Sequence, residues 1–149
     1  MTDEIRKNII DATTRLLARR EHSEVELVQK LIQKGFDPAS VQPVLIEFQQ
    51  ADIQSDKRFA ESRVRHAANK GIGPNRVRAE LSQHQIDDEF IHVAFSETDI
   101  DWFELAKAVH TKKYASQKPD TFKDKQKQRQ FLQYRGFTFE QIQYAMENP

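Results

Sequence analysis

The chain has 149 residues, of which 38% are hydrophobic and 31% are charged, and its mean hydropathy is −0.78. It contains no cysteine, which excludes disulfide bonds, thiol catalysis and cysteine-based zinc sites. The first residues carry no apolar run typical of a signal peptide, and no segment approaches the roughly 20 apolar residues of a membrane span. We therefore expect a soluble, cytoplasmic, elongated protein with no membrane partner.

The formal net charge is zero, but basic residues are concentrated in two stretches. Residues 57–78 contain seven lysines and arginines, and residues 107–135 contain nine. A neutral protein with two basic stretches can bind a polyanion through one face.

Three segments share one apolar pattern, at a spacing of 50 and then 51 residues. They are Leu31–Phe36, Leu81–Ile86 and Leu132–Phe137, and apolar residues after each segment continue the alignment. Such self-similarity is typical of tandem repeats. We therefore predict three units, at residues 1–53, 54–99 and 100–149.

In the first unit, apolar residues recur at helical spacing from Ile5 to Leu17. Ser23 and Glu26 form a capping box, which predicts a second helix running to about residue 34. Gly35 occupies the position of a left-handed helix end, and Asp37-Pro38 predicts the start of a third helix.

In the second unit, the pattern predicts a helix over about residues 56–69. Gly71-Ile72-Gly73-Pro74 then breaks the chain and restarts it with proline in the first turn. Asp87 or Asp88 caps the third helix. Because Gln85 stands where the other units have glycine, we expect a less sharply capped helix end there.

In the third unit, a helix is predicted from about Ile100 to Tyr114, followed by the polar connection Ser116–Asp120. A second helix contains Phe131, and a capping box at Thr138–Gln141 opens the last one. One unit alone would bury little core, whereas three in a row can support one another. The sequence predicts an all-α fold of three tandem three-helix, helix-turn-helix-like repeats in an elongated, curved array.

No pattern of catalytic, metal-binding or nucleotide-binding residues emerges. The five histidines are scattered, which favours surface or cap-adjacent positions over a metal site. The acids Asp87–Glu89 lie where a helix begins, so capping explains them better than a cation does. The segment Gly71–Pro74 lacks the Lys-Ser or Lys-Thr pair of a phosphate-binding loop. We expect no enzymatic activity, no metal and no cofactor.

The helix start after Gly73 has two equally favoured interpretations. It is either a turn alone or a turn with an anion site, because Lys70, Arg76 and Arg78 flank it.

The candidate binding residues are cations of the two basic stretches, expected to surround equivalent turns in the second and third units. Tyr114, Tyr134 and Phe122 lie among them; stacking on bases is one role, and core packing is at least as favoured for the latter two. An acidic protein surface would fit the same cations as well as a phosphate backbone. The candidates are Arg58, Arg63, Arg65, Lys70, Arg76, Arg78, Lys112, Lys113, Lys123, Lys125, Lys127, Arg129 and Arg135.

Fragments along essentially the whole chain resemble the RecX family of recombinase regulators. The matching fragments are Leu16–Leu27, Lys34–Phe36, Asp56–Glu61, Lys70–Pro74, Asp101–Ala106, Lys112–Tyr114, Lys125–Leu132 and Tyr134–Phe137.

The resemblance implies three tandem three-helix repeats and a bacterial modulator of the RecA recombinase. Such a protein binds the RecA filament on single-stranded DNA and inhibits its recombinase, ATPase and co-protease activities. It thereby modulates DNA repair and the SOS response. We expect a monomer, with duplex DNA as a weaker additional ligand.

Two other functions stay open from the residues themselves. The first is a stand-alone helix-turn-helix-like protein that reads duplex DNA with the helix at 123–135. The second is a helical protein–protein adaptor whose binding is insensitive to salt. Reversal of Lys112, Lys113, Lys125 and Arg129 would abolish filament binding in the RecX-like account, and would not affect an adaptor.

Overall fold

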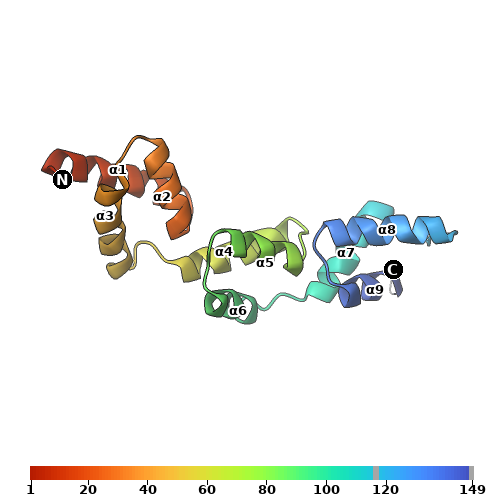
Figure 1. Ribbon diagram of the computed structural model, residues 1–149. Coiled ribbons are helices and arrows are strands. Elements are labelled where there is room, and N and C mark those ends of the chain that lie inside the picture. The colour runs from red at the N-terminus through yellow and green to blue at the C-terminus, as the bar shows by residue number, and fades with distance from the viewer. Residues whose placement is uncertain (116–117, 148–149) are drawn as a thin grey trace.

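The computed structural model describes residues 1–115 and 118–147, and in these ranges the chain forms helices and no strand (Figure 1). The predicted connection begins at Ser116 and Gln117, which lie outside the described residues. The helices are α1 (Asp3–Arg19), α2 (Glu24–Gln33), α3 (Pro38–Gln50), α4 (Asp56–Asn69), α5 (Pro74–Gln83), α6 (Asp88–Glu97), α7 (Trp102–Tyr114), α8 (Phe122–Tyr134) and α9 (Phe139–Glu147).

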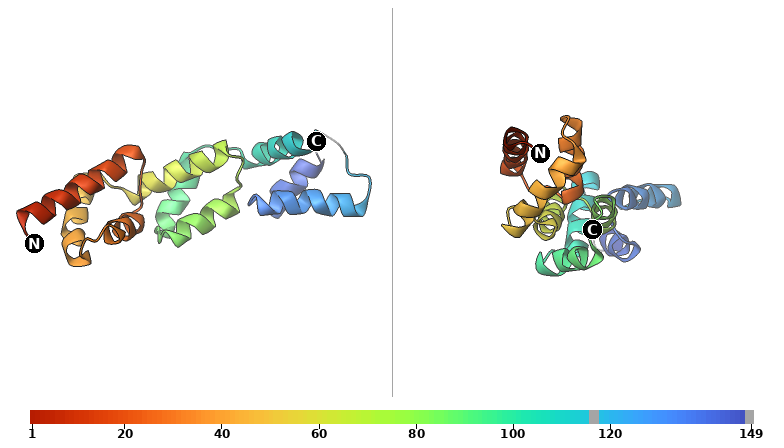
Figure 2. Two further views of the ribbon diagram at one scale, coloured as in Figure 1. Left: turned by 90° about the horizontal axis from the view of Figure 1, so that it is seen from above. Right: turned by 60° about the vertical axis from the view of Figure 1, so that its left-hand side comes forward.

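The helices group into three consecutive units, α1–α3, α4–α6 and α7–α9, each with its own hydrophobic core. The units follow one another along the long axis of the molecule, with the first and third at opposite ends (Figures 1 and 2). The predicted all-α array of three-helix units is confirmed. We propose unit boundaries in the short linkers after α3 and after α6.

The apolar positions shared by the three repeats form the three cores. Leu31, Leu81 and Leu132 occupy equivalent places in the second helix of each unit, and all three are 0% exposed. Burial of a leucine side chain contributes about 1.5–3 kcal/mol, so this one position anchors each unit.

Two predicted capping boxes differ in detail. At the start of α9, the Thr138 hydroxyl accepts from the Gln141 N–H, and the Gln141 side chain accepts from the Thr138 N–H. At the start of α2, the Ser23 hydroxyl accepts from the Glu26 N–H, but the Glu26 carboxylate binds the Arg20 guanidinium instead. The capping box at the start of α2 is therefore one-sided, because the Arg20 guanidinium competes for the Glu26 carboxylate.

The expectation of a weaker helix end at Gln85 is wrong. Gln85 adopts a left-handed conformation with φ +56°, and the Ile86 N–H donates to the Leu81 carbonyl at 3.1 Å. The equivalent hydrogen bond, from the Phe36 N–H to the Leu31 carbonyl at 3.2 Å, closes the helix at Gly35, where φ is +99°. Glutamine thus adopts the turn that glycine adopts elsewhere, at a cost of about 1–2 kcal/mol in backbone conformation.

Polar side chains join the first unit to the second. The Glu24 N–H donates to the Asp56 carboxylate at 2.9 Å, and Ser23 Oγ lies 2.9 Å from His84 Nδ1. Arg58, on the first turn of α4, donates to the Glu21 carboxylate at 3.0 Å.

Two of the five histidines, for which surface or cap-adjacent positions were expected, are buried. His22 is cap-adjacent, because it precedes Ser23 at the start of α2, whereas His110 lies within α7 and contradicts the expectation. His22 and His110 are each 1% exposed. His22 Nε2 lies 3.1 Å from Lys30 Nζ, and His110 Nε2 lies 2.7 Å from Gln128 Oε1. Burial lowers the pKa of the His22 imidazole. Both rings are held by neighbours within their own units and act as structural groups.

Candidate functional site

The second and third units meet where two turns touch. The Gly73 N–H donates to the Arg135 carbonyl at 2.7 Å, and the Asn75 N–H donates to the Gly136 carbonyl at 2.9 Å. These are amides at the start of α5 that an anion would need. The anion-site interpretation of this helix start is therefore wrong, since the turn of the third unit already occupies it.

Both turns need glycine because their backbones lie against one another. A Cβ atom on Gly73 would lie 2.4 Å from the Gly136 carbonyl carbon, and one on Gly136 would lie 2.4 Å from Arg76 Cβ. Cβ atoms do not approach other heavy atoms this closely. The contact fixes the turn after α8 against the start of α5.

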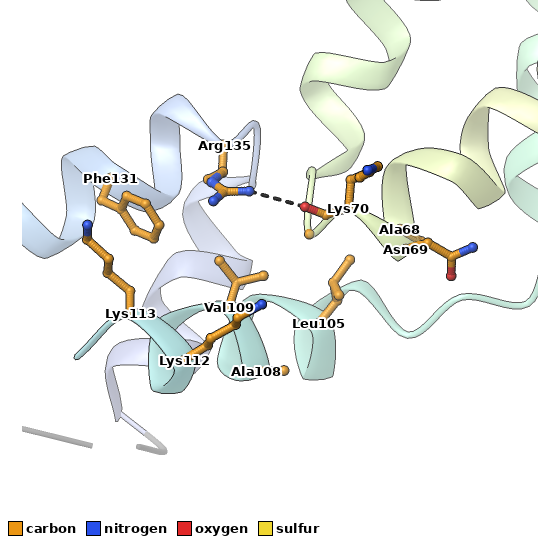
Figure 3. A pocket seen from close by; sticks show the side chains of 11 residues that line it. Ala68, Asn69, Lys70, Leu105, Ala108, Val109, Lys112, Lys113, Phe131 and Arg135 are labelled. Carbon is orange, nitrogen blue, oxygen red and sulfur yellow. Dashed lines mark hydrogen bonds between the residues drawn. The ribbon is translucent and has the colours of Figure 1, made fainter. Parts of the chain in front are cut away.

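A pocket of about 400 Å³ opens between the end of α4 and the facing sides of α7 and α8 (Figure 3). Its walls are apolar, from Leu105, Val109 and Phe131, and cations surround them. Its lining consists of Ala68, Asn69, Lys70, Gly71, Leu105, Ala108, Val109, Lys112, Lys113, Phe131 and Arg135.

Two of the cations are held in place by specific contacts. The Arg135 guanidinium donates to the Lys70 carbonyl at 3.1 Å, and its Cζ atom lies 5.3 Å from the centroid of the Phe131 ring. Lys113 Nζ lies 5.5 Å from the same ring centroid. Cations over an aromatic ring gain about 0.5–1 kcal/mol at exposed sites, so Phe131 gathers positive charge at this pocket.

No acidic side chain is among the residues that line the pocket. Lys70, Lys112 and Lys113 are exposed, and none of the three has an ion pair within the described ranges. Four cations from two units thus share one concave surface, which we call the basic pocket. Its chemistry suits a phosphate group or another anion.

Other predicted cations lie elsewhere. Arg58 lies at the opposite end of α4 from the turn it was expected to surround, and it pairs with Glu21 and Asp52. Arg63 donates to the Glu80 carboxylate at 2.7 Å. The expectation that Arg58 surrounds the second unit's turn is therefore wrong, and acidic side chains engage both Arg58 and Arg63.

The remaining cations of the second unit are exposed. Arg76 lies beside the junction, with Cζ 5.6 Å from the centroid of the Tyr134 ring. Arg78 packs within its own unit, with Cζ 4.4 Å from the centroid of the Phe95 ring. Arg65 has no partner within the described part of the chain.

The cations of α8 do not form a single corner. Lys123, Lys125 and Lys127 are exposed along the helix. Arg129 lies in a second groove with Asn75, on the side of α8 away from Phe131. The structure therefore divides the basic stretch between two surfaces.

The three aromatic residues of the basic stretch differ in their exposure to solvent. Tyr114 is half-buried and meets the Phe131 ring edge-on, with centroids 5.8 Å apart. Tyr134 and Phe122, for which core packing was at least as favoured as base stacking, are 77% and 73% exposed, so core packing is wrong for both.

Sequence reasoning missed the apolar walls of the basic pocket. Phe131 and Val109 match the helical core pattern, and nothing local indicates that they also face the neighbouring unit. The glycines at equivalent turns were the available signal, since glycine permits a close approach of backbones. Within the described residues there is no helix long and apolar enough to cross a membrane, and no cluster of three or more metal-binding side chains.

Models of RecX three-helix domains match most of the chain. The first RecX domain matches residues 11–48, the second matches 55–94 and the third matches 99–146. The chain belongs to the RecX family.

Named relatives agree with this assignment. Regulatory protein RecX of Vibrio vulnificus (strain CMCP6) is 42% identical over 138 residues, which cover 93% of this chain and 90% of that protein. Regulatory protein RecX of Halorhodospira halophila (strain DSM 244 / SL1) is 40% identical, over 91% of this chain and 84% of that protein. The relatives are named as regulatory proteins, and this chain belongs to the same family.

Solved RecX structures share the fold. A crystal structure of RecX from Lactobacillus salivarius superposes with a TM-score of 0.81 at 22% identity, over 98% of this chain and 97% of that chain. A crystal structure of regulatory protein RecX has a TM-score of 0.82 at 24% identity, over 97% of this chain and 74% of that chain.

Proposed function

We propose that this RecX protein binds the RecA recombinase filament assembled on single-stranded DNA. There it inhibits the recombinase, ATPase and co-protease activities, and so modulates DNA repair and the SOS response. The protein acts by binding in the cytoplasm, as a monomer, and not as an enzyme. The observation that carries this proposal is the basic pocket at the junction of the second and third units.

The pocket supports the proposal through its charge and its place in the array. Lys70, Lys112, Lys113 and Arg135 line one surface with no acidic side chain among them. Exposed lysines contact phosphates as point charges, and each neutralised phosphate releases counterions. An elongated molecule with such a surface at the junction of two units suits the groove of a helical nucleoprotein filament.

The groove beside α8 argues against autonomous reading of duplex DNA. A recognition helix must present its base-reading side chains to the major groove. On α8, Gln126, Arg129 and Gln133 line a groove shared with α9 and with Asn75 of the second unit. Arg129 and Gln133 are exposed but face this groove, where Arg129 is the one cation, so we place duplex DNA as at most a weak ligand.

The test is filament binding by charge-reversal variants. Fluorescence anisotropy of a RecA filament on labelled oligo(dT), with a non-hydrolysable ATP analogue, reports binding of the added chain. The double variant Lys112→Glu/Lys113→Glu is expected to bind at least about tenfold more weakly, with unchanged circular dichroism. The control is Arg15→Glu, an exposed cation of the first unit.

Salt dependence separates this proposal from a neutral adaptor. Binding of the parent chain should weaken steeply with added salt, and the slope should be smaller for the double variant. Equal binding by the parent and the double variant would remove the basic pocket from the interface.

A further inference from the structure

A second groove, of about 360 Å³, runs between α8 and α9. Gln126, Arg129 and Gln133 recur at helical spacing along α8 and form one wall. The other residues come from α9 and its approach, with one from α5. The lining consists of Asn75, Gln126, Arg129, Gln133, Phe137, Phe139, Ile142 and Gln143. We call this surface the amide groove.

The amide groove has an apolar floor and one exposed aromatic edge. Phe137 is 2% exposed and Ile142 is 7% exposed, so both are fixed parts of the third unit. Phe139 is 72% exposed, so its ring offers an accessible apolar surface at the edge of the groove. An apolar floor with a few polar groups around it is typical of a ligand site, and the volume falls in the range of about 300–1,000 Å³ for such sites.

The polar groups around the floor are amides that have no partner. Within the described ranges, no hydrogen bond reaches the side chains of Asn75, Gln126 or Gln133. The Gln143 side chain is occupied, since it donates to the Glu147 carboxylate at 2.9 Å. Each free amide offers a donor and an acceptor, which is the same pair that a peptide unit offers. The groove can therefore pair with an extended backbone.

The charge of the amide groove narrows the class of ligand that it can bind. Arg129 is its one cation, and no acidic side chain lines it. A guanidinium binds a carboxylate through two parallel hydrogen bonds. A nucleic acid strand would need several phosphates neutralised along its path, and the basic pocket supplies four cations where this groove supplies one. The balance of amides, apolar floor and single cation favours a peptide.

We propose that the amide groove binds an extended peptide segment of a partner protein. The segment places an apolar side chain on Phe137 and Ile142, against Phe139, and a carboxylate of an Asp or Glu on Arg129. Its backbone pairs with the amides of Gln126, Gln133 and Asn75. This site is separate from the basic pocket, so its failure would leave the proposed filament function standing.

The test uses random dodecapeptides displayed on phage, selected against the full-length chain. Enriched sequences are expected to share an apolar residue with an Asp or Glu close by. Synthetic copies of these peptides are then measured by fluorescence anisotropy. Arg129→Glu and Phe139→Ser should each weaken binding at least about tenfold, whereas Arg15→Glu should change it less than about twofold.

Two controls keep the result decisive. Arg129 and Phe139 both have exposed side chains, so the circular dichroism spectra of their variants should match that of the parent. Excess oligo(dT) should not displace the peptides. The proposal would be overturned if the peptides bound Arg129→Glu as well as they bind the parent, or if oligo(dT) displaced them. It would also be overturned if the selected peptides shared no apolar residue with an Asp or Glu close by.

Discussion

Gly73 and Gly136 lie against one another at the junction of the second and third units, with a space between them too small for a methyl group. A Cβ on Gly73 would lie 2.4 Å from the Gly136 carbonyl carbon. Because the Lys70 carbonyl and the Arg135 guanidinium meet beside this contact, the glycines also set the shape of the basic pocket.

Alanine at Gly136 should cost more stability than alanine at the equivalent Gly35. Both glycines have φ +99°, which costs a non-glycine residue about 1–2 kcal/mol. Only Gly136 is crowded, since a Cβ there would lie 2.4 Å from Arg76 Cβ, whereas nothing lies within 4 Å of one on Gly35. Urea unfolding should show an additional loss of about 1–3 kcal/mol for Gly136→Ala. Equal losses would contradict the close packing of the two turns.

Arg58→Ala should loosen the first unit from the second. The Arg58 guanidinium donates to the Glu21 carboxylate at 3.0 Å, and to the Asp52 carboxylate at 2.9 Å. Because the side chain is partly exposed, we expect a loss of only about 1 kcal/mol in the free energy of unfolding, decreasing with added salt. Arg58→Lys should restore little, since lysine lacks the forked donors. Arg65→Ala is the control, and a loss there as large as at Arg58 would contradict the account.

Glu26 should make stability depend on acid pH. Burial raises the pKa of its carboxyl, but the hydrogen bonds and charge of Arg20, with His22 and Lys30, outweigh burial and lower it to about 2. When the pKa of a carboxyl is lower in the folded chain than in the unfolded chain, the ionised carboxylate stabilises the fold. This stabilisation is fully present at pH values above the pKa of the unfolded chain. That stabilisation, up to about 3 kcal/mol, is lost as the pH falls from about 5 to about 2.

Glu26→Gln should remove this dependence. Urea unfolding of the parent and Glu26→Gln should differ most near neutral pH, and the two should converge at the acid end. Glu140→Gln, an exposed first-turn glutamate of α9, is the control. A difference between parent and Glu26→Gln that is constant with pH would show that the Arg20 pair does not hold the carboxyl charged.

Gln128→Ala should destabilise the third unit. His110 Nε2 lies 2.7 Å from Gln128 Oε1, and the two side chains are 1% and 6% exposed. The other ring nitrogen of His110 already has no partner within the described ranges. Loss of the amide would leave a buried donor unpaired, at a cost of about 1–3 kcal/mol by thermal unfolding. Gln130→Ala, on the exposed side of α8, should cost less than about 0.5 kcal/mol, and parity between the two variants would contradict this.

Local patterns were enough to predict the helices and their cores. Leu31, Leu81 and Leu132 repeat in register, and their burial follows from the same period that places them on one helix face. Asp101 shows the limit at a boundary: its side chain accepts from the Glu104 N–H, so α7 begins at Trp102 and not at Ile100.

The candidate site could be predicted only in part, because its shape depends on contacts between units. The positive charge of Lys112 and Lys113 could be predicted from the sequence. The hydrogen bond from Arg135 to the Lys70 carbonyl could not, because the two residues are 65 positions apart. Arg58 and Glu21 pair across 37 residues, which removed one cation from the expected cluster. A local sequence pattern cannot predict contacts between residues that are this far apart in the chain.

The most direct measurement is a titration of this chain into a preformed RecA filament on single-stranded DNA with ATP, following ATP hydrolysis. The account predicts inhibition at less than one molecule per RecA subunit, and loss of inhibition in Lys112→Glu/Lys113→Glu but not in Arg15→Glu. Uninhibited hydrolysis in the presence of chain shown by circular dichroism to be folded would contradict the proposed function. Equal inhibition by the parent and the double variant would contradict the basic pocket as its site.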